Sequence, residues 1–139
     1  MKKNIVILIL ILLIVIALTG CSDSVFDSEY KEFKESYVLS TSFVEEDNDS
    51  LKAIKKMDIC MVESELKNMK VSMEKIAGRL SSKTEQGIYG NLETYYQGLE
   101  FLVYAAKNID QLTIEEKRKV YGKALFVINN RRSIMQGDK

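Results

Sequence analysis

The sequence predicts an all-α domain arranged as an up-down four-helix bundle, and three observations support this prediction. The 139 residues contain no proline, whereas Lys, Glu, Leu, Ile and Met are abundant, a composition that favours helix. Apolar residues recur at steps of three and four along four consecutive segments, and no stretch shows the alternation of a strand. The net charge of these segments alternates between acidic and basic, so that sequence neighbours in such a bundle attract each other.

The first twenty residues predict an export signal in front of the bundle. Lys2 and Lys3 precede an apolar run from Ile5 to Leu18, which is shorter than the roughly 20 residues that a membrane-spanning helix needs. The run ends in Leu18-Thr19-Gly20-Cys21. This ending resembles the lipobox of bacterial lipoproteins, a family in which the cysteine sulfur receives a diacylglycerol and the signal is cleaved just before it.

The resemblance implies that residues 1–20 are removed, that Cys21 carries the lipid and that 21–24 form a short tether. The protein would then sit on the extracytoplasmic face of the cell membrane, with 25–139 as the helical bundle. The alternative is an uncleaved N-terminal anchor beside an incidental Cys21.

The first two predicted helices span about 25–46 and 51–80. In the first, apolar positions run from Phe26 to Val44 and a charged break follows at 45–49. Ser50 can cap the second helix, whose core stripe consists of Val62, Leu66, Met69, Met73, Ile76 and Leu80.

A loop is predicted at Ser81–Thr84, and the last two predicted helices follow it, at about 85–109 and 113–132. The third carries the most regular stripe, which consists of Ile88, Leu92, Tyr95, Leu99, Leu102, Ala106 and Ile109. Thr113 and Glu116 form a predicted capping box for the fourth. That helix is expected to direct Ile114, Tyr121, Ala124, Leu125 and Ile128 to the core.

Composition excludes several classes of active site. The chain has no histidine, which rules out histidine-dependent triads and HExxH zinc sites, and its balanced charge argues against nucleic-acid binding. Glu93 and Glu100 on one helix flank suggest a solvated face rather than a paired-carboxylate site. The basic runs at 117–119 and 131–132 could touch anionic lipid headgroups, although a solvated helix face explains them as well. We therefore expect no enzyme and no cofactor.

Two groups of residues remain as candidates for binding. Met57, Cys60 and Met61 offer soft sulfur ligands for Cu(I) at helical spacing, or they simply fill the core. Phe101 and Tyr104 lie opposite the core stripe of their helix, beside a line of small residues formed by Gly87, Thr94, Gly98 and Ala105. Either a neighbouring helix or a partner protein packs there.

These features together predict a membrane-anchored protein-binding module with an envelope or surface protein as its partner. Small lipoproteins that exclude phage or conjugative DNA, or that confer immunity to a toxin, are similar in size and in cellular location. The alternative is an envelope metal-handling or redox protein that uses Cys60, Met57 and Met61.

Overall fold

The computed structural model describes residues 25–137, and this part of the chain is all-helical. The predicted signal peptide and Cys21 lie outside these residues. The elements are α2 (Val25–Ser40), the short 3-10 helix η1 (Ser42–Glu45), α3 (Ser50–Lys55), α4 (Ile59–Ala77), α5 (Lys83–Asn108) and α6 (Ile114–Gln136). No helix in this range is long and apolar enough to cross a membrane.

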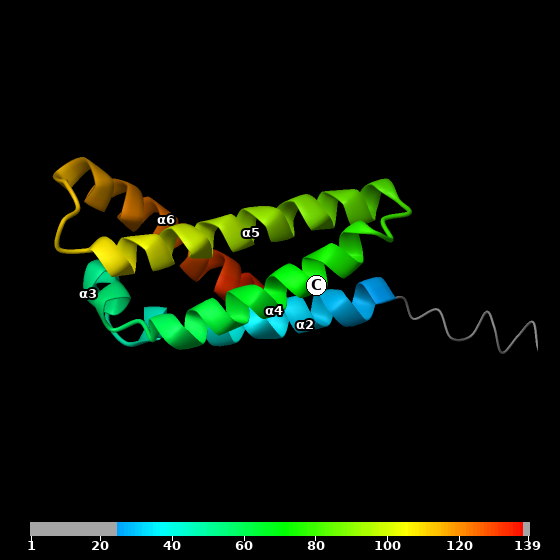
Figure 1. Ribbon diagram of the computed structural model, residues 1–139, viewed down its shortest axis with the longest axis horizontal. Coiled ribbons are helices and arrows are strands. Elements are labelled where there is room, and N and C mark those ends of the chain that lie inside the picture. Colours follow the sequence, from blue (N-terminus) through cyan, green and yellow to red (C-terminus); the bar gives the residue numbers. More distant parts are fainter. Residues whose placement is uncertain (1–24, 138–139) are drawn as a thin grey trace, which may run out of the picture.

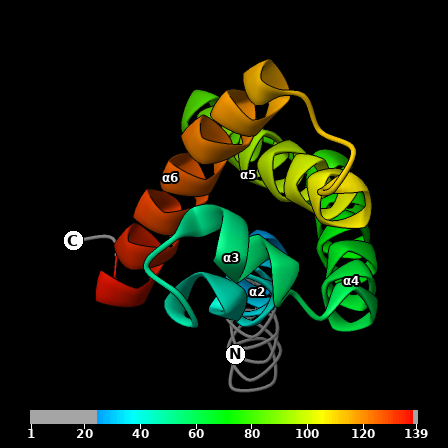
Figure 2. The ribbon, with the colours of Figure 1, turned by 90° about the vertical axis from the view of Figure 1, so that its left-hand side faces the viewer.

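The long helices pack in the order of the chain. α2 packs most extensively on α4, α4 contacts α5, α5 contacts α6, and α6 returns to touch α2. Figure 1 shows the chain reversing direction between successive long helices. In Figure 2, α5 lies across the molecule from α2, and α6 is inclined to the other long helices. The short α3 fills one end, against α5, α6 and η1.

The predicted helix 25–46 is too long, because α2 stops at Ser40 and only a 3-10 turn follows. The hydroxyls of Ser40 and Thr41 both donate to the Tyr37 carbonyl, at 3.0 and 2.6 Å. Serine and threonine side chains that bond nearby carbonyls compete with helix continuation. Ser40 and Thr41 therefore favour termination of α2 at this point.

The predicted helix 51–80 is wrong as a single element, since it is divided into α3 and α4. Asp49, rather than Ser50, caps α3 by accepting from the backbone N–H groups of Leu51 and Lys52. Asp58 caps α4 by accepting from the Met61 N–H. Aspartate is a favoured N-cap residue, so each of these two carboxylates starts a new helix.

Capping boxes define the starts of α5 and α6. The predicted Thr113–Glu116 box is confirmed, and α6 continues to Gln136, past the expected end at 132. A second box, Ser82–Glu85, starts α5 at Lys83, and α4 already ends at Ala77, so the connecting loop spans 78–82 rather than the predicted 81–84. Hydrogen bonds from Thr113 to Glu116, and from Ser81 and Ser82 to Glu85, lower the pKa of both glutamates.

The predicted core stripes of 51–80 and 85–109 are largely confirmed. In the stripe predicted for 113–132, Ala124 is buried and Ile128 is half-buried, but the other three positions are wrong. Ile114, Tyr121 and Leu125 are exposed, at 76%, 40% and 58%. The buried face of α6 consists instead of Val120, Ala124, Val127 and Arg131. This face also advances by steps of four and three, so periodicity alone fits either register.

Alternating charge accounts for only part of the pairing between helices. Glu29, in the acidic segment 21–49, bonds Lys75, in the basic segment 50–83, at 2.7 Å, as the charge pattern predicts. Lys107 of α5 pairs with Glu63 of α4, however, and each of these residues has the minority charge of its segment. Individual side-chain positions therefore decide the pairs.

Tyr37 supplies a prediction about the core. Its hydroxyl is buried without a hydrogen-bond partner in residues 25–137, and burial raises its pKa above the ordinary value of 10.0. Since an unpaired buried hydroxyl costs about 1–3 kcal/mol, we expect Tyr37→Phe to be as stable as the wild type or more stable by about 1 kcal/mol.

The raised pKa also fixes a pH dependence. Above pH 10.0, Tyr37 ionises in the unfolded state before it ionises in the native state, which favours unfolding. The stability that the neutral phenol gives the native state is therefore complete below pH 10.0 and is lost as the pH rises above it. Urea unfolding should show a shallower alkaline decline in Tyr37→Phe than in the wild type. Tyr104→Phe, at an exposed position, is the matched control. An equal decline in Tyr37→Phe would contradict the assignment.

Candidate functional site

The small-residue line on α5 lies partly against α6. Gly98 and Ala105 are buried, and a Cβ placed on Gly98 would lie 3.4 Å from two ring carbons of Phe126. A neighbouring helix therefore occupies this part of the line, one of the two alternatives that the sequence left open. Gly87 and Thr94 are exposed.

Beside this contact, α5 and α6 leave an open groove, which we call the α5–α6 groove. It is lined by Phe101, Lys119, Gly122, Lys123 and Phe126. Both phenyl rings are half-buried, and Gly122 leaves the floor open because nothing lies within 4 Å of where its Cβ would be. Phe101 is partly buried against the core, so its side of α5 packs in part against the bundle.

The electrostatics of the groove are cationic. The Lys123 ammonium lies 5.7 Å from the centre of the Phe126 ring, which is within the range of a cation–π contact. The Lys119 ammonium lies 3.2 Å from Oε1 of Glu115, one helical turn earlier, and the two form an ion pair. An apolar floor between two lysines suits an apolar side chain carried by an acidic segment.

Tyr104 lies one helical turn beyond Phe101 and is 58% exposed. It does not line the α5–α6 groove. Its backbone carbonyl accepts a hydrogen bond of 2.8 Å from the Asn108 side chain. A role for Phe101 and Tyr104 in binding a partner stays a prediction.

The sulfur residues do not share one helix face. Met57 precedes α4 and is buried, Cys60 is exposed on the first turn of that helix, and Met61 is half-buried. The helical spacing behind the copper hypothesis therefore does not apply to Met57. Within residues 25–137, no three Cys, Asp or Glu side chains form a group that could hold a metal ion.

On the other flank of α5, carboxylates and tyrosines line a groove towards α4. Glu93 and Glu100 are exposed, as expected for a solvated face. Partial burial and the neighbouring carboxylates raise the pKa of Tyr89 and Tyr96, so both phenols stay neutral near pH 7. A raised phenol pKa makes a tyrosine a weaker nucleophile near pH 7, not an activated one.

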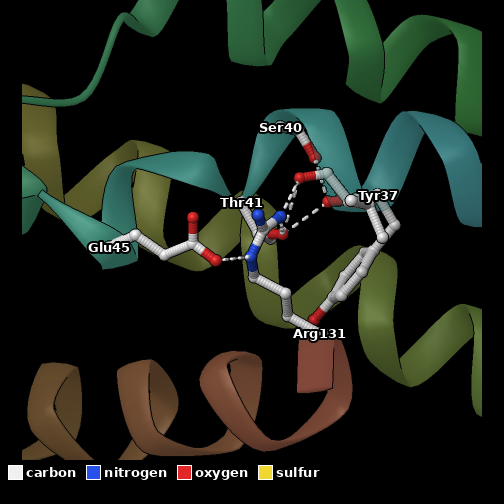
Figure 3. Close-up of polar contacts among 6 residues, drawn as sticks. Tyr37, Ser40, Thr41, Glu45 and Arg131 are labelled. Atoms are coloured by element: carbon white, nitrogen blue, oxygen red, sulfur yellow. Dashed lines mark hydrogen bonds and ion pairs between the residues drawn. The ribbon is translucent and has the colours of Figure 1, made fainter. Parts of the chain in front are cut away.

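Arg131 is the polar residue that the sequence analysis misjudged, because it is only 6% exposed rather than solvated. Figure 3 shows its guanidinium extending from α6 towards the end of α2. Its Nε donates to Glu45 Oε1 at 3.0 Å, and its Nη1 donates to the Val38 carbonyl and to Thr41 Oγ1. A cation at the C-terminal end of a helix satisfies free carbonyls and interacts favourably with the dipole.

This arrangement fastens α6 to the corner between α2 and η1, and we assign Arg131 a structural role. One signal in the sequence could have revealed it. The stripe Val120, Ala124, Val127 continues at the next step of four to Arg131, which is the position of a core residue.

No protein-family model, curated protein or solved structure matches this chain.

Proposed function

We propose that this chain is an exported lipoprotein whose helical domain binds a protein partner on the extracytoplasmic face of the cell membrane. The lipobox-like Leu18-Thr19-Gly20-Cys21 supports the anchor. The order of helix contacts supports description of the domain as an up-down bundle. The α5–α6 groove supports partner binding, and it is the observation that carries the proposal.

The geometry of the groove favours binding over catalysis. An apolar side chain of the partner would cover Phe101 and Phe126, while acidic groups beside it would meet Lys119 and Lys123. Buried aromatic anchors surrounded by polar contacts supply most of the affinity of protein interfaces. A small anchored domain of this kind suits exclusion or immunity, in which one envelope or secreted protein is recognised and blocked.

The anchor has a direct test. We expect Cys21→Ser to remain an unlipidated precursor, because only Cys21 follows the lipobox-like residues. Labelling of cells with radioactive palmitate, followed by purification of the protein, measures this. Retention of palmitate by Cys21→Ser at the wild-type level would refute the assignment, and Cys60→Ser is the matched control.

The groove is tested by filling it. Gly122→Leu should occupy the open floor without a clash and should keep or raise stability, because glycine costs a helix about 1 kcal/mol relative to a good helix former. A photo-cross-linking residue at Lys119 in intact cells should yield one protein adduct, and Gly122→Leu should reduce that adduct at least tenfold. Gly87→Leu, at another open helical glycine, should leave it unchanged.

The outcomes of this experiment are distinct. An adduct that is equally strong in Gly122→Leu would show that the partner does not use the groove. The same cross-linker at Val71, which is exposed on α4, reports contacts unrelated to the groove. Absence of any adduct at Lys119 in cells that show the phenotype of the protein would also refute the proposal.

A further inference from the structure

A second exposed apolar surface lies where α2 meets the end of α6. We call it the α2–α6 shelf, and it is lined by Lys31, Lys34, Glu35, Val38, Leu39, Ile134 and Met135. Leu39 is 52% exposed and Met135 is 57% exposed. Exposed apolar side chains that gather on one surface commonly mark a contact with a partner or a membrane.

The shelf is cationic although α2 as a whole is acidic. Its single carboxylate, Glu35, lies 3.8 Å from Lys31 in an ion pair, so the charge of Lys34 is left in excess. Lys34 is half-buried over the ring of Tyr30, at 4.3 Å from its centre. Two other acids of α2 face α4, where Glu29 bonds Lys75 and both Glu29 and Glu32 line a separate groove.

The length of chain in front of α2 limits how far the shelf can be from the anchor. Three residues separate Cys21 from Val25, and the four extended steps between their Cα atoms span at most about 14 Å. From Val25, Leu39 lies fourteen residues further along α2, or about 21 Å at 1.5 Å per residue. With α2 upright on the membrane, the shelf would therefore be held away from the lipid, whereas with α2 lying flat it can reach the lipid.

We propose that the α2–α6 shelf rests on an anionic phospholipid bilayer, with Leu39 and Met135 at the level of the headgroups and acyl chains. This inference rests on the proposed lipid anchor at Cys21. Apolar residues flanked by lysines are the combination that binds such interfaces, and each lysine near an anionic surface contributes about 1 kcal/mol. In this orientation α5, which lies across the molecule from α2, faces away from the membrane (Figure 2). The α5–α6 groove then remains accessible to a partner.

The test uses the full chain, purified from bacterial membranes and reconstituted into vesicles. In a Cys60→Ser background, an environment-sensitive fluorophore is attached to Leu39→Cys, to Met135→Cys or to Val71→Cys, the exposed control on α4. The vesicles contain phosphatidylcholine with 30% phosphatidylglycerol and a lipid that bears a spin-label quencher. We expect the fluorophores at positions 39 and 135 to be quenched at least threefold more than the fluorophore at 71.

Charge is tested in the same vesicles. Lys31→Gln combined with Lys34→Gln should reduce the excess quenching at position 39 by at least half. Substitution of Lys67 and Lys70 on α4 by glutamine is the matched control, and it should not change the quenching.

Failure of the inference and failure of the anchor give different results. If the protein floats with the vesicles and its intact mass includes the lipid, equal quenching at 39 and 71 overturns the resting orientation alone. If the mass lacks acyl chains and the protein does not float, the anchor fails and the orientation fails with it. Energy transfer between copies labelled at position 39 in detergent would assign the shelf to a second copy of the chain and would also overturn the inference.

Discussion

Arg131→Met should lower the free energy of unfolding by about 1.5–3 kcal/mol, which is the range for hydrogen bonds that involve a charged group. Methionine keeps most of the side-chain volume but donates to neither the Val38 carbonyl nor Thr41 Oγ1. Glu45 is 59% exposed, so its carboxylate returns to water and adds little to the loss. Urea denaturation followed by circular dichroism measures the change.

The control for this variant is adjacent in the chain. Arg132 is exposed, and Arg132→Met should change stability by no more than about 0.5 kcal/mol. Arg131→Lys keeps the charge but lacks the planar guanidinium with its several donors. Its free energy of unfolding should therefore lie between those of Arg131→Met and the wild type. A stability of Arg131→Met equal to or above the wild type would show that the cost of burying the guanidinium exceeds the gain from its hydrogen bonds.

Gly98→Leu should also destabilise the domain, by about 2–3 kcal/mol, because it overpacks the contact between α5 and α6. Its Cβ alone would lie 3.4 Å from the Phe126 ring and 3.8 Å from a methyl group of Val127, which leaves no room for the rest of the side chain. Gly98→Ala adds only the Cβ and gains helix propensity of about 1 kcal/mol, so it should be near neutral.

Gly87→Leu is the control, because Gly87 has nothing within 4 Å of a Cβ position and the same substitution there should not destabilise. Urea midpoints for the three variants decide the outcome. Similar midpoints for Gly98→Leu and Gly87→Leu would mean that α5 and α6 do not approach as closely at Gly98 as described.

The helical class and most of the buried stripes follow from the order of residues in the chain. Leu92, Leu99 and Leu102 were placed correctly because burial of one face of a helix imposes a period near 3.6 residues. The Thr113–Glu116 box was predictable because its two residues lie within one helical turn of each other. Ser82–Glu85, Asp49 and Asp58 are equally local helix-start signals, and none of them was among the predictions.

For the candidate site, the sequence showed that Phe101 and Tyr104 lie off the main stripe beside small residues. It did not show that Phe126 covers Gly98, or that Gly122 leaves the neighbouring floor open. These facts depend on which turn of α6 meets which turn of α5, and that register comes from packing between segments far apart in the chain.

The phase of α6 was decided by the tertiary structure alone. Leu125 is as apolar as Val120 and Val127, Tyr121 adds a large aromatic ring, and both sets follow helical spacing. The difference comes from Arg131, which shares a face with Val120 and Val127 and finds acceptors about 90 residues away, at Val38, Thr41 and Glu45. A guanidinium can be buried only where its donors are satisfied, and the folded arrangement of α2 and η1 provides those acceptors.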